Sequence, residues 1–232
     1  MNKIIRILVA ILLAMATAAI CVLISCNVQP TGKSVDLGLP SGTLWADRNV
    51  GAALPEGYGD YFAWGESIPK STYYNWVTYK YAKDDPKKLM KYCSSPDYSL
   101  YALTDGRTNL ERSDDAATAN WGSNWCMPTQ EQLQELIDNC TWTWTTRNGK
   151  NGYEVKGKNG NSIFLPAAGY RSETSIEDVD FSGYYWSSSL NESRPSDGLR
   201  LHFSSCYVEL YGRGDRSSGF SLVRCGANNS LI

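Results

Sequence analysis

Strict alternation of apolar and polar side chains marks several stretches of the C-terminal half. The segment Thr141–Thr146 reads Thr-Trp-Thr-Trp-Thr-Thr, and Tyr207–Tyr211 places valine and leucine between polar residues. In Leu199–Phe203, leucine and phenylalanine alternate with arginine and histidine. A period of two predicts strands with one buried and one polar face. Further strands are predicted at 153–156, 162–165, 184–188 and 220–224, with Asn-Gly turn sequences between several of them.

Two stretches carry helix signals. Thr129 and Gln132 form a T-x-x-Q capping box, and apolar residues follow at positions 133, 136, 137 and 140. That spacing predicts a helix that buries one face. Ser113 is followed by Asp114, Asp115 and two alanines. This order predicts a second, short helix that Ser113 caps and whose first turn is acidic.

The N-terminal half has weaker patterns. Residues 35–50 predict one or two opening strands and residues 60–65 a short strand. The stretch 73–110 is rich in Tyr, Lys, Asp and Ser without a period, which predicts an irregular excursion over the surface. Two helices with many short antiparallel strands predict an α+β fold in one domain, residues 35–225, followed by a tail at 226–232.

The first 26 residues have the pattern of an export signal. A basic start precedes an apolar run, Ile7–Ile24, as is typical of secretory signals. The run ends in Leu-Ile-Ser-Cys, which resembles a bacterial lipobox and implies removal of residues 1–25 with lipid on Cys26. An uncleaved transmembrane anchor is the alternative, because about eighteen mostly apolar residues approach the minimum span. Either way, the rest of the chain is expected outside the cytoplasm, tethered to a membrane through residues 26–34.

Composition and charge narrow the classes of function. Charged residues make up 20% and hydrophobic ones 42%, which fits a folded chain rather than a disordered one. Without Lys3 and Arg6 of the signal, 20 of the 22 basic residues remain against 24 acidic ones. No basic stripe runs along the sequence, so nucleic acid is not an expected partner. The chain has 8 tryptophans and 15 tyrosines but only 5 phenylalanines. Aromatic rings that carry a polar group suit half-buried surfaces in contact with water.

Cysteine and histidine usage limits the chemistry. Of seven cysteines, Cys21 leaves with the signal and Cys26 takes lipid. An odd number then remains in an oxidising compartment, namely Cys93, Cys126, Cys140, Cys206 and Cys225. No C-x-x-C spacing occurs, and His202 is the only histidine. A structural zinc site or a His-based catalytic site is therefore hard to assemble, and we expect no metal, no cofactor and no enzymatic activity.

Seven motifs along the chain carry a resemblance to a known family. They are Val35–Trp45, Tyr61–Glu66, Asp115–Ala117 with Trp121-Gly122, Met127–Thr129, Asn139–Trp144, Gly160–Arg171 and Gly183–Ser189. In this order they resemble the Fibrobacter succinogenes major paralogous domain, a family abundant in lipoproteins of gut Bacteroidetes. The resemblance spans about residues 35–224. It implies a C-type-lectin-like fold, shared with formylglycine-generating enzymes and the variable proteins of diversity-generating retroelements. That superfamily hosts sugar binders, protein binders and a few enzymes, so the resemblance implies no single function.

The chain departs from the family pattern at two cysteines. Cys126 stands where the family usually has Arg, and Cys225 where it usually has Pro. Both lie at ends of the conserved core, so a Cys126–Cys225 disulfide is a candidate pairing. The calcium motifs of sugar-binding C-type lectins are missing, and no cysteine pair matches the catalytic pair of formylglycine-generating enzymes. Carboxylates such as Asp114-Asp115 and Glu177-Asp178 are interpreted as helix-start and loop charges.

The outward side of the last strands is the candidate ligand-binding surface. Strand alternation turns one series inward, namely Leu199, Leu201, Phe203, Val208 and Leu210. It turns the other outward: Arg200, His202, Tyr207, Glu209, Tyr211 and Arg213. Recognition surfaces favour Tyr, Arg and His, and retroelement variable proteins bind ligands through their C-terminal part. A merely solvated sheet face is the alternative. The tryptophans at 121, 125 and 186 are expected to be scaffold.

The sequence thus predicts a binding module. It would be a lipid-anchored protein of the outer membrane or cell surface whose C-type-lectin-like domain binds a protein or glycan ligand. Membership among the retroelement-diversified variable proteins is a further hypothesis. The alternative is a structural, tip or accessory subunit of a surface fibre, in which the same face contacts another subunit. An enzyme of the formylglycine-generating type ranks third.

Overall fold

A computed structural model of the chain describes residues 32–226. The predicted signal peptide, the lipidation site Cys26, and most of the predicted tether and tail lie outside the described residues. Within 32–226, no helix combines the length and the apolar character needed to cross a membrane.

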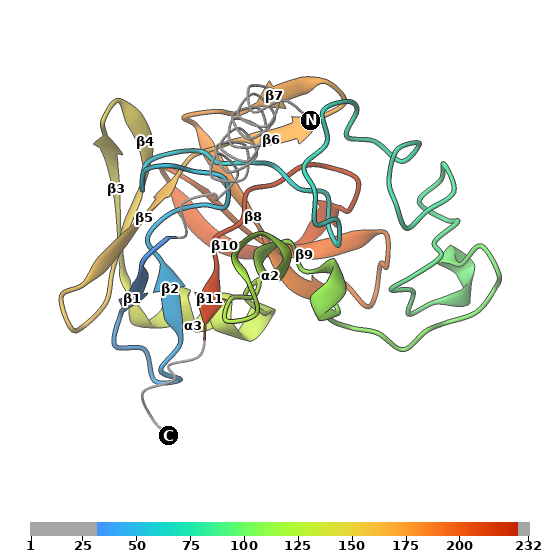
Figure 1. Cartoon of the computed structure of the whole chain (residues 1–232), viewed down its shortest axis with the longest axis horizontal. Coiled ribbons are helices and arrows are strands. Elements are labelled where there is room, and N and C mark those ends of the chain that lie inside the picture. Colours follow the sequence, from blue (N-terminus) through green and yellow to red (C-terminus); the bar gives the residue numbers. More distant parts are fainter. Residues whose placement is uncertain (1–31, 227–232) are drawn as a thin grey trace, which may run out of the picture. The chain divides into compact units, whose positions relative to one another are not determined.

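Three three-stranded antiparallel sheets and one hairpin form the framework of the described residues (Figure 1). One sheet has the order β10-β9-β8, with β8 at Ser182–Leu190, β9 at Asp197–Ser204 and β10 at Tyr207–Asp215. The second, β3-β4-β5, comprises Thr141–Arg147, Lys150–Lys156 and Ser162–Pro166. The smallest, β1-β2-β11, joins Ser34–Asp36, Leu44–Ala46 and Cys225–Gly226, so it holds the two ends of the described chain together. Strands β6, Tyr170–Ser172, and β7, Ser175–Glu177, form the hairpin.

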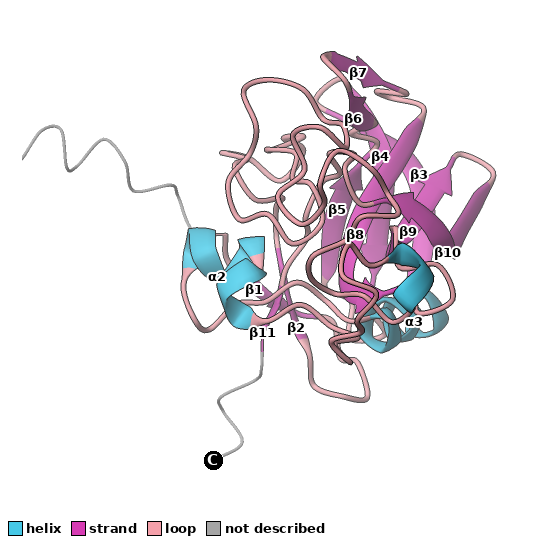
Figure 2. Ribbon diagram, turned by 90° about the vertical axis from the view of Figure 1, so that its right-hand side faces the viewer, coloured by secondary structure: helices cyan, strands magenta, loops and turns pink. Residues whose placement is uncertain are grey.

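Two short α-helices complete the described part of the chain. Helix α2 spans Ala116–Trp121 and helix α3 spans Gln130–Asn139. Single 3-10 turns occur at Pro96–Tyr98 and Arg112–Asp114. Helix α3 packs against β8, β9 and β10, and Figure 2 shows it beside β9 and β10. The predicted α+β class, with mainly antiparallel strands and two short helices, is therefore confirmed for residues 32–226.

The N-terminus of α3 has the predicted capping box. The Thr129 side chain accepts a hydrogen bond from the Gln132 backbone N–H, and the Gln132 side chain accepts one from the Thr129 N–H. Leu133 and Leu136 are fully buried on one face, as their spacing predicts. The start of α3 and the face that it buries therefore follow from the sequence alone.

The cap of α2 differs from the prediction. The helix begins after Asp115, whose carboxylate accepts from the Thr118 N–H, and not after Ser113. Ser113 lies in the 3-10 turn before it. Asp114 turns into the protein, where it accepts hydrogen bonds from Lys91 Nζ and the Tyr92 hydroxyl. The long loop before α2 supplies these partners, and local sequence does not show them.

Two predicted strands are reduced to isolated bridges. In residues 60–65 only Phe62 forms a bridge, with Phe220. The predicted closing strand at 220–224 contributes bridges at Phe220 and Ser221, and regular pairing begins only at β11. Backbone groups of this region bond to irregular segments instead, as when the Trp64 N–H donates to the Arg216 carbonyl. The β6–β7 hairpin was not predicted, because its short strands lack a clear alternation.

The β8–β9–β10 sheet lies between two hydrophobic clusters. Tyr185, Leu201 and Phe203 point into one cluster, which also holds the buried leucines of α3. On the opposite face, Tyr184 and Trp186 of β8 join an aromatic cluster built largely from the loops before α2. The side of the sheet expected to face solvent is therefore covered at β8 and open along β9 and β10.

Trp186 shows why this covered side is closely packed. Its ring is fully buried, stacks on Phe220 with centroids 4.0 Å apart, and donates from Nε1 to the Phe62 carbonyl. Gly198 and Gly214 lie opposite each other on β9 and β10. A Cβ at Gly214 would collide with the Trp186 ring, and a Cβ at Gly198 would collide with Trp64 and press against Trp186. The two glycines thus leave the space that Trp186 fills.

Two arginines are fully buried, with opposite surroundings. Arg216 donates to the Tyr79 hydroxyl and to the carbonyls of Tyr92, Pro195 and Lys91, and so ties the loops to the sheet. The three guanidinium nitrogens of Arg224 have no hydrogen-bond partner among the described residues.

The predicted scaffold tryptophans at the α2 end surround Arg224. Its guanidinium stacks against Trp121, and its carbon lies 5.6 Å from the ring centroid of Trp125. Trp121 is buried, whereas Trp125 is half-buried. Burial lowers the pKa of Arg224.

Candidate ligand-binding face

Five of the six predicted ligand-facing residues come together on one side of the β9–β10 pair. Tyr211 lies opposite Arg200, Glu209 opposite His202, and Tyr207 opposite Ser204. Residues directly opposite each other in an antiparallel pair share a face. We call Arg200, His202, Tyr207, Glu209 and Tyr211 the β9–β10 face. Tyr207 is 41% and Tyr211 37% exposed. Leu201 and Phe203, which alternate with Arg200 and His202 along β9, are fully buried.

Arg213 is separated from this face by a register shift. Tyr211 opposes Arg200, but the next pair is Gly214 opposite Gly198, so β10 advances three residues while β9 advances two. Such a bulge breaks the alternation of side chains. Alternation from Tyr211 therefore does not by itself place Arg213 on the β9–β10 face, and its assignment as a ligand contact stays a prediction.

Tyr184 of β8 extends the face and was missed by the sequence analysis. It lies opposite His202, and the two rings stack with centroids 4.5 Å apart and planes 18° from parallel. Its hydroxyl donates to Asp178, 2.7 Å away. Tyr170 packs edge-on against Tyr184, with ring centroids 5.0 Å apart. The available signal is the period of two in residues 184–188, which predicts that Tyr184 shares a face of the sheet with Trp186.

His202 lies at the centre of this aromatic group. Tyr207 and Tyr211 approach its ring edge-on, with centroids at 5.1 and 6.4 Å, and the Tyr207 hydroxyl lies 3.1 Å from Nε2. Burial, and secondarily the positive charge of Arg200, lower the pKa of His202 to about 4. The imidazole is therefore neutral at physiological pH, and its 3.8 Å contact with Glu209 is not an ion pair there.

Arg200 is clamped between aromatic rings. Its guanidinium carbon lies 4.8 Å from the ring centroid of Tyr184, 5.0 Å from that of Phe220 and 5.4 Å from that of Tyr211. Within residues 32–226 it has no ion-pair partner, and its buried Nε has no hydrogen-bond acceptor. Desolvation lowers its pKa. The side chain is a cation held in place by rings and not by an acid.

This arrangement is suited to binding more than to catalysis. Neutral His202 with a depressed pKa is a weak base. The side chain within hydrogen-bond reach of its ring is that of Tyr207, and Glu209 lies slightly farther away, so neither neighbour is a serine or cysteine nucleophile. Among the described residues, no three His, Cys, Asp or Glu side chains are grouped so as to hold a metal ion. Rings, a guanidinium and flanking carboxylates are groups that orient a ligand.

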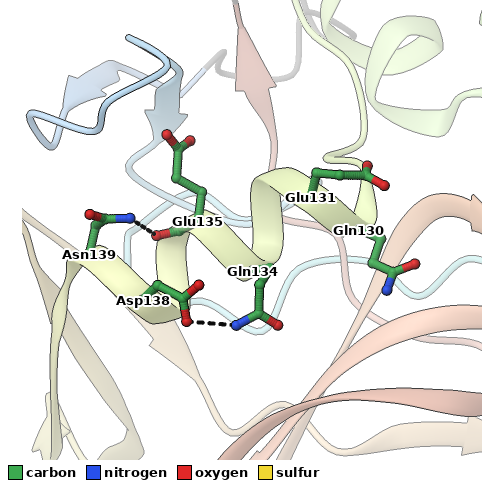
Figure 3. A pocket seen from close by; sticks show the side chains of 6 residues that line it. All are labelled: Gln130, Glu131, Gln134, Glu135, Asp138 and Asn139. Atoms are coloured by element: carbon green, nitrogen blue, oxygen red, sulfur yellow. Dashed lines mark hydrogen bonds between the residues drawn. The ribbon is translucent and has the colours of Figure 1, made fainter.

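Three hollows of the described surface lie away from the β9–β10 face. One follows the polar side of α3 and is lined by Gln130, Glu131, Gln134, Glu135, Asp138 and Asn139 (Figure 3). Figure 3 shows two of its bonds, from Gln134 to Asp138 and from Asn139 to the Glu135 carbonyl. Glu135 is engaged further by the Ser41 N–H and hydroxyl. Four of these six residues thus bond to each other or to the Ser41 loop, and the hollow follows the polar side of one helix.

The two cysteines of the candidate disulfide are adjacent. Cys126 and Cys225 form an antiparallel bridge, each donating its N–H to the other's carbonyl. Their sulfurs lie 3.5 Å apart, and both are thiols in this structure. The hydrogen bond with Cys225 lowers the pKa of Cys126. The pair joins β11 to the segment between α2 and α3, and the two cysteines are 99 positions apart in the sequence.

The chain was also compared with known proteins. Protein-family models, curated proteins and solved structures give no match. The function of the β9–β10 face therefore has to be inferred from its own residues and their geometry.

Proposed function

We propose that this protein is a binding module whose β9–β10 face binds a protein or glycan ligand at the cell surface. The observation that carries the proposal is the make-up of the face. Tyr207 and Tyr211 are exposed rings on paired strands, and Arg200 is pre-positioned without an ionic partner in the described chain. Rigidly held Tyr and Arg side chains are the residues that most often dominate binding energy.

The sequence motifs support placing this module in the C-type-lectin-like superfamily. They resemble the Fibrobacter succinogenes major paralogous domain, and a mainly antiparallel α+β architecture is compatible with that fold. Ligand contacts on C-terminal strands also match the hypothesis of a retroelement-diversified variable protein. Lipid on Cys26 would hold the module at the outer membrane or cell surface.

A subunit of a surface fibre is the second candidate function. Strand β10 is at the edge of its sheet, and no strand among residues 32–226 pairs with its outer side. Such an edge can accept a strand from another chain. In that case the β9–β10 face would contact a neighbouring subunit. Copurification of the chain with fibre proteins would favour this candidate.

The test is binding by the full chain, purified in detergent, to arrays of glycans and of cell-surface proteins. Loss of a central Tyr should weaken binding by about thirtyfold, or about 2 kcal/mol. Tyr207→Ser and Tyr211→Ser are compared with Tyr73→Ser and Tyr101→Ser, whose exposed rings lie outside the face. Equal binding by all four variants and the unaltered chain would overturn the proposal.

A further inference from the structure

Arg200 is the one cation of the β9–β10 face as defined above, and its charge has no counter-ion in the described chain. The carboxylate that contributes to its electrostatic environment, Asp197, pairs with Arg194 at 3.3 Å. The Nε of Arg200 is buried without an acceptor, whereas its two Nη nitrogens are not among the fully buried unpartnered atoms. A largely desolvated guanidinium normally meets an anion, because burying an unpaired charge is costly.

The rings around Arg200 hold it ready for such an anion. Tyr184, Tyr211 and Phe220 pack around the guanidinium at 4.8–5.4 Å. A long side chain that is already immobilised loses little entropy when it binds. Its planar fork matches a carboxylate through two parallel hydrogen bonds. The open Nη end of Arg200 is therefore a pre-organised binding site, called the seat below, for one carboxylate.

The surroundings restrict the rest of the ligand. Three exposed carboxylates lie around the aromatic group that holds Arg200: Glu209, opposite His202 on β10, and Glu177 and Asp178, at and just after the end of β7. Tyr170 and Tyr184 donate their hydroxyls to Glu177 and Asp178, at 2.8 and 2.7 Å. These acids would repel a ligand that carries many negative charges. They are also strong acceptors for neutral hydroxyl groups.

A ligand that fits combines one carboxylate with many hydroxyls and an apolar flank. Tyr207 and Tyr211 offer exposed rings beside the seat, and neutral His202 offers a ring nitrogen. A sugar ring has C–H groups for the tyrosines and hydroxyls for the flanking acids. A peptide side chain with one carboxylate lacks those hydroxyls.

We infer that Arg200 binds the carboxylate of an acidic monosaccharide at the end of an otherwise neutral glycan. This inference rests on the proposed function of the β9–β10 face and specifies its ligand class. The carboxylate lies on the Nη end of Arg200, the hydroxyls on Glu209 and Asp178, and the sugar ring against Tyr211.

The test measures binding of the full chain in detergent to defined probes. The acidic probes are sialyllactose and a disaccharide ending in glucuronic acid, the neutral ones are lactose and the methyl ester of sialyllactose, and a peptide with one glutamate serves as the rival. We expect at least one acidic sugar to bind and esterification to weaken it at least tenfold. Arg200→Gln should weaken it by a similar factor, and Arg200→Lys, which keeps the charge without the fork, by less. Arg147→Gln, on the other sheet, should leave binding unchanged.

The outcomes separate this inference from the proposed function. Equal binding of ester and acid, or failure of both acidic sugars to bind, overturns the acidic-sugar ligand. If the glutamate peptide instead binds in an Arg200-dependent way, the face is a binding site for protein and the sugar inference is wrong. If Tyr207→Ser and Tyr211→Ser bind the array targets as well as the unaltered chain does, both the proposed function and the acidic-sugar inference are wrong. The single histidine signal in NMR spectra shows whether Arg200→Gln is folded. Removing the Arg200 charge raises the pKa of His202, but burial, the larger cause of its lowering, keeps that pKa below 6.5 if the face stays ordered.

Discussion

His202 stacks on Tyr184 across the β8–β9 pair, with ring centroids 4.5 Å apart and planes 18° from parallel. Tyr184 is nearly buried and is fixed by its hydrogen bond to Asp178. The exposed half of the sheet is thus joined to the aromatic cluster beneath the loops. The protonation of His202 consequently reports on the order of the whole β9–β10 face.

The first prediction concerns that protonation. We expect His202 to titrate near pH 4 in the folded protein, against about 6.5 in the unfolded chain. Above pH 6.5 both states are neutral. As the pH falls from 6.5 towards 4, the unfolded chain takes up the proton first, so the free energy of unfolding decreases over this window. NMR titration of the imidazole, the only one in the chain, measures it. A midpoint near 6.5 would show that the ring is solvated and the face is not ordered as described.

The second prediction separates two tryptophans. Trp186 is fully buried, stacked on Phe220 and hydrogen-bonded, whereas Trp125 is half-buried. Trp186→Ala should therefore lower the free energy of unfolding by about 3–5 kcal/mol, and Trp125→Ala by clearly less. Chemical denaturation of both variants gives the two values. A Trp186→Ala protein with native stability and lost binding would instead make Trp186 a ligand contact.

The third prediction compares the two buried arginines. Arg216→Met removes four hydrogen bonds and leaves the carbonyls of Tyr92, Pro195 and Lys91 unpaired, so we expect a loss of about 3 kcal/mol or more. Arg224→Met removes a buried cation without hydrogen bonds in the described chain, and should leave stability unchanged or raise it by about 1–2 kcal/mol. Melting of the two single variants decides the matter. A large loss in Arg224→Met would show that Arg224 has a partner that the described residues do not include.

The fourth prediction concerns Cys126 and Cys225. With sulfurs 3.5 Å apart in the thiol form, we expect these two and no other pair of the five cysteines to join under mild oxidation. The bond would close a loop of about 100 residues, for which the chain-entropy model gives about 4–5 kcal/mol. Peptide mapping by mass spectrometry without reductant identifies the pair. Treatment with oxidised glutathione that leaves both thiols free, or links either one to Cys93, Cys140 or Cys206, would refute this pairing.

Local patterns predicted what local interactions determine. The capping box at Thr129 and Gln132 places α3, and alternation places β3, β9 and most of β10. Five of the six proposed face residues follow from that alternation. Arg213 does not, because a bulge between Tyr211 and Gly214 interrupts the regular pairing, and the alternation pattern does not show that bulge.

Features set by distant contacts could not be predicted in this way. Asp114 and Asp115 are neighbours, yet Asp115 caps α2 while Asp114 binds Lys91 and Tyr92 of a remote loop. The clamp on Arg200 needs Phe220 from an irregular segment as well as Tyr184 from β8. A single sequence does not show which loop covers which half of a sheet, and here that covering decides which part of the face remains free to bind.

The most direct test of the central claim is covalent tyrosine footprinting of the full chain, free and bound to its strongest array target. Mass spectrometry gives the labelling rate of each tyrosine. The account predicts that binding protects Tyr207 and Tyr211 and leaves Tyr73 and Tyr101 unchanged, since all four rings are exposed in the free chain and only the first two lie on the β9–β10 face. Protection of Tyr73 or Tyr101 with undiminished labelling of Tyr207 and Tyr211 would contradict it.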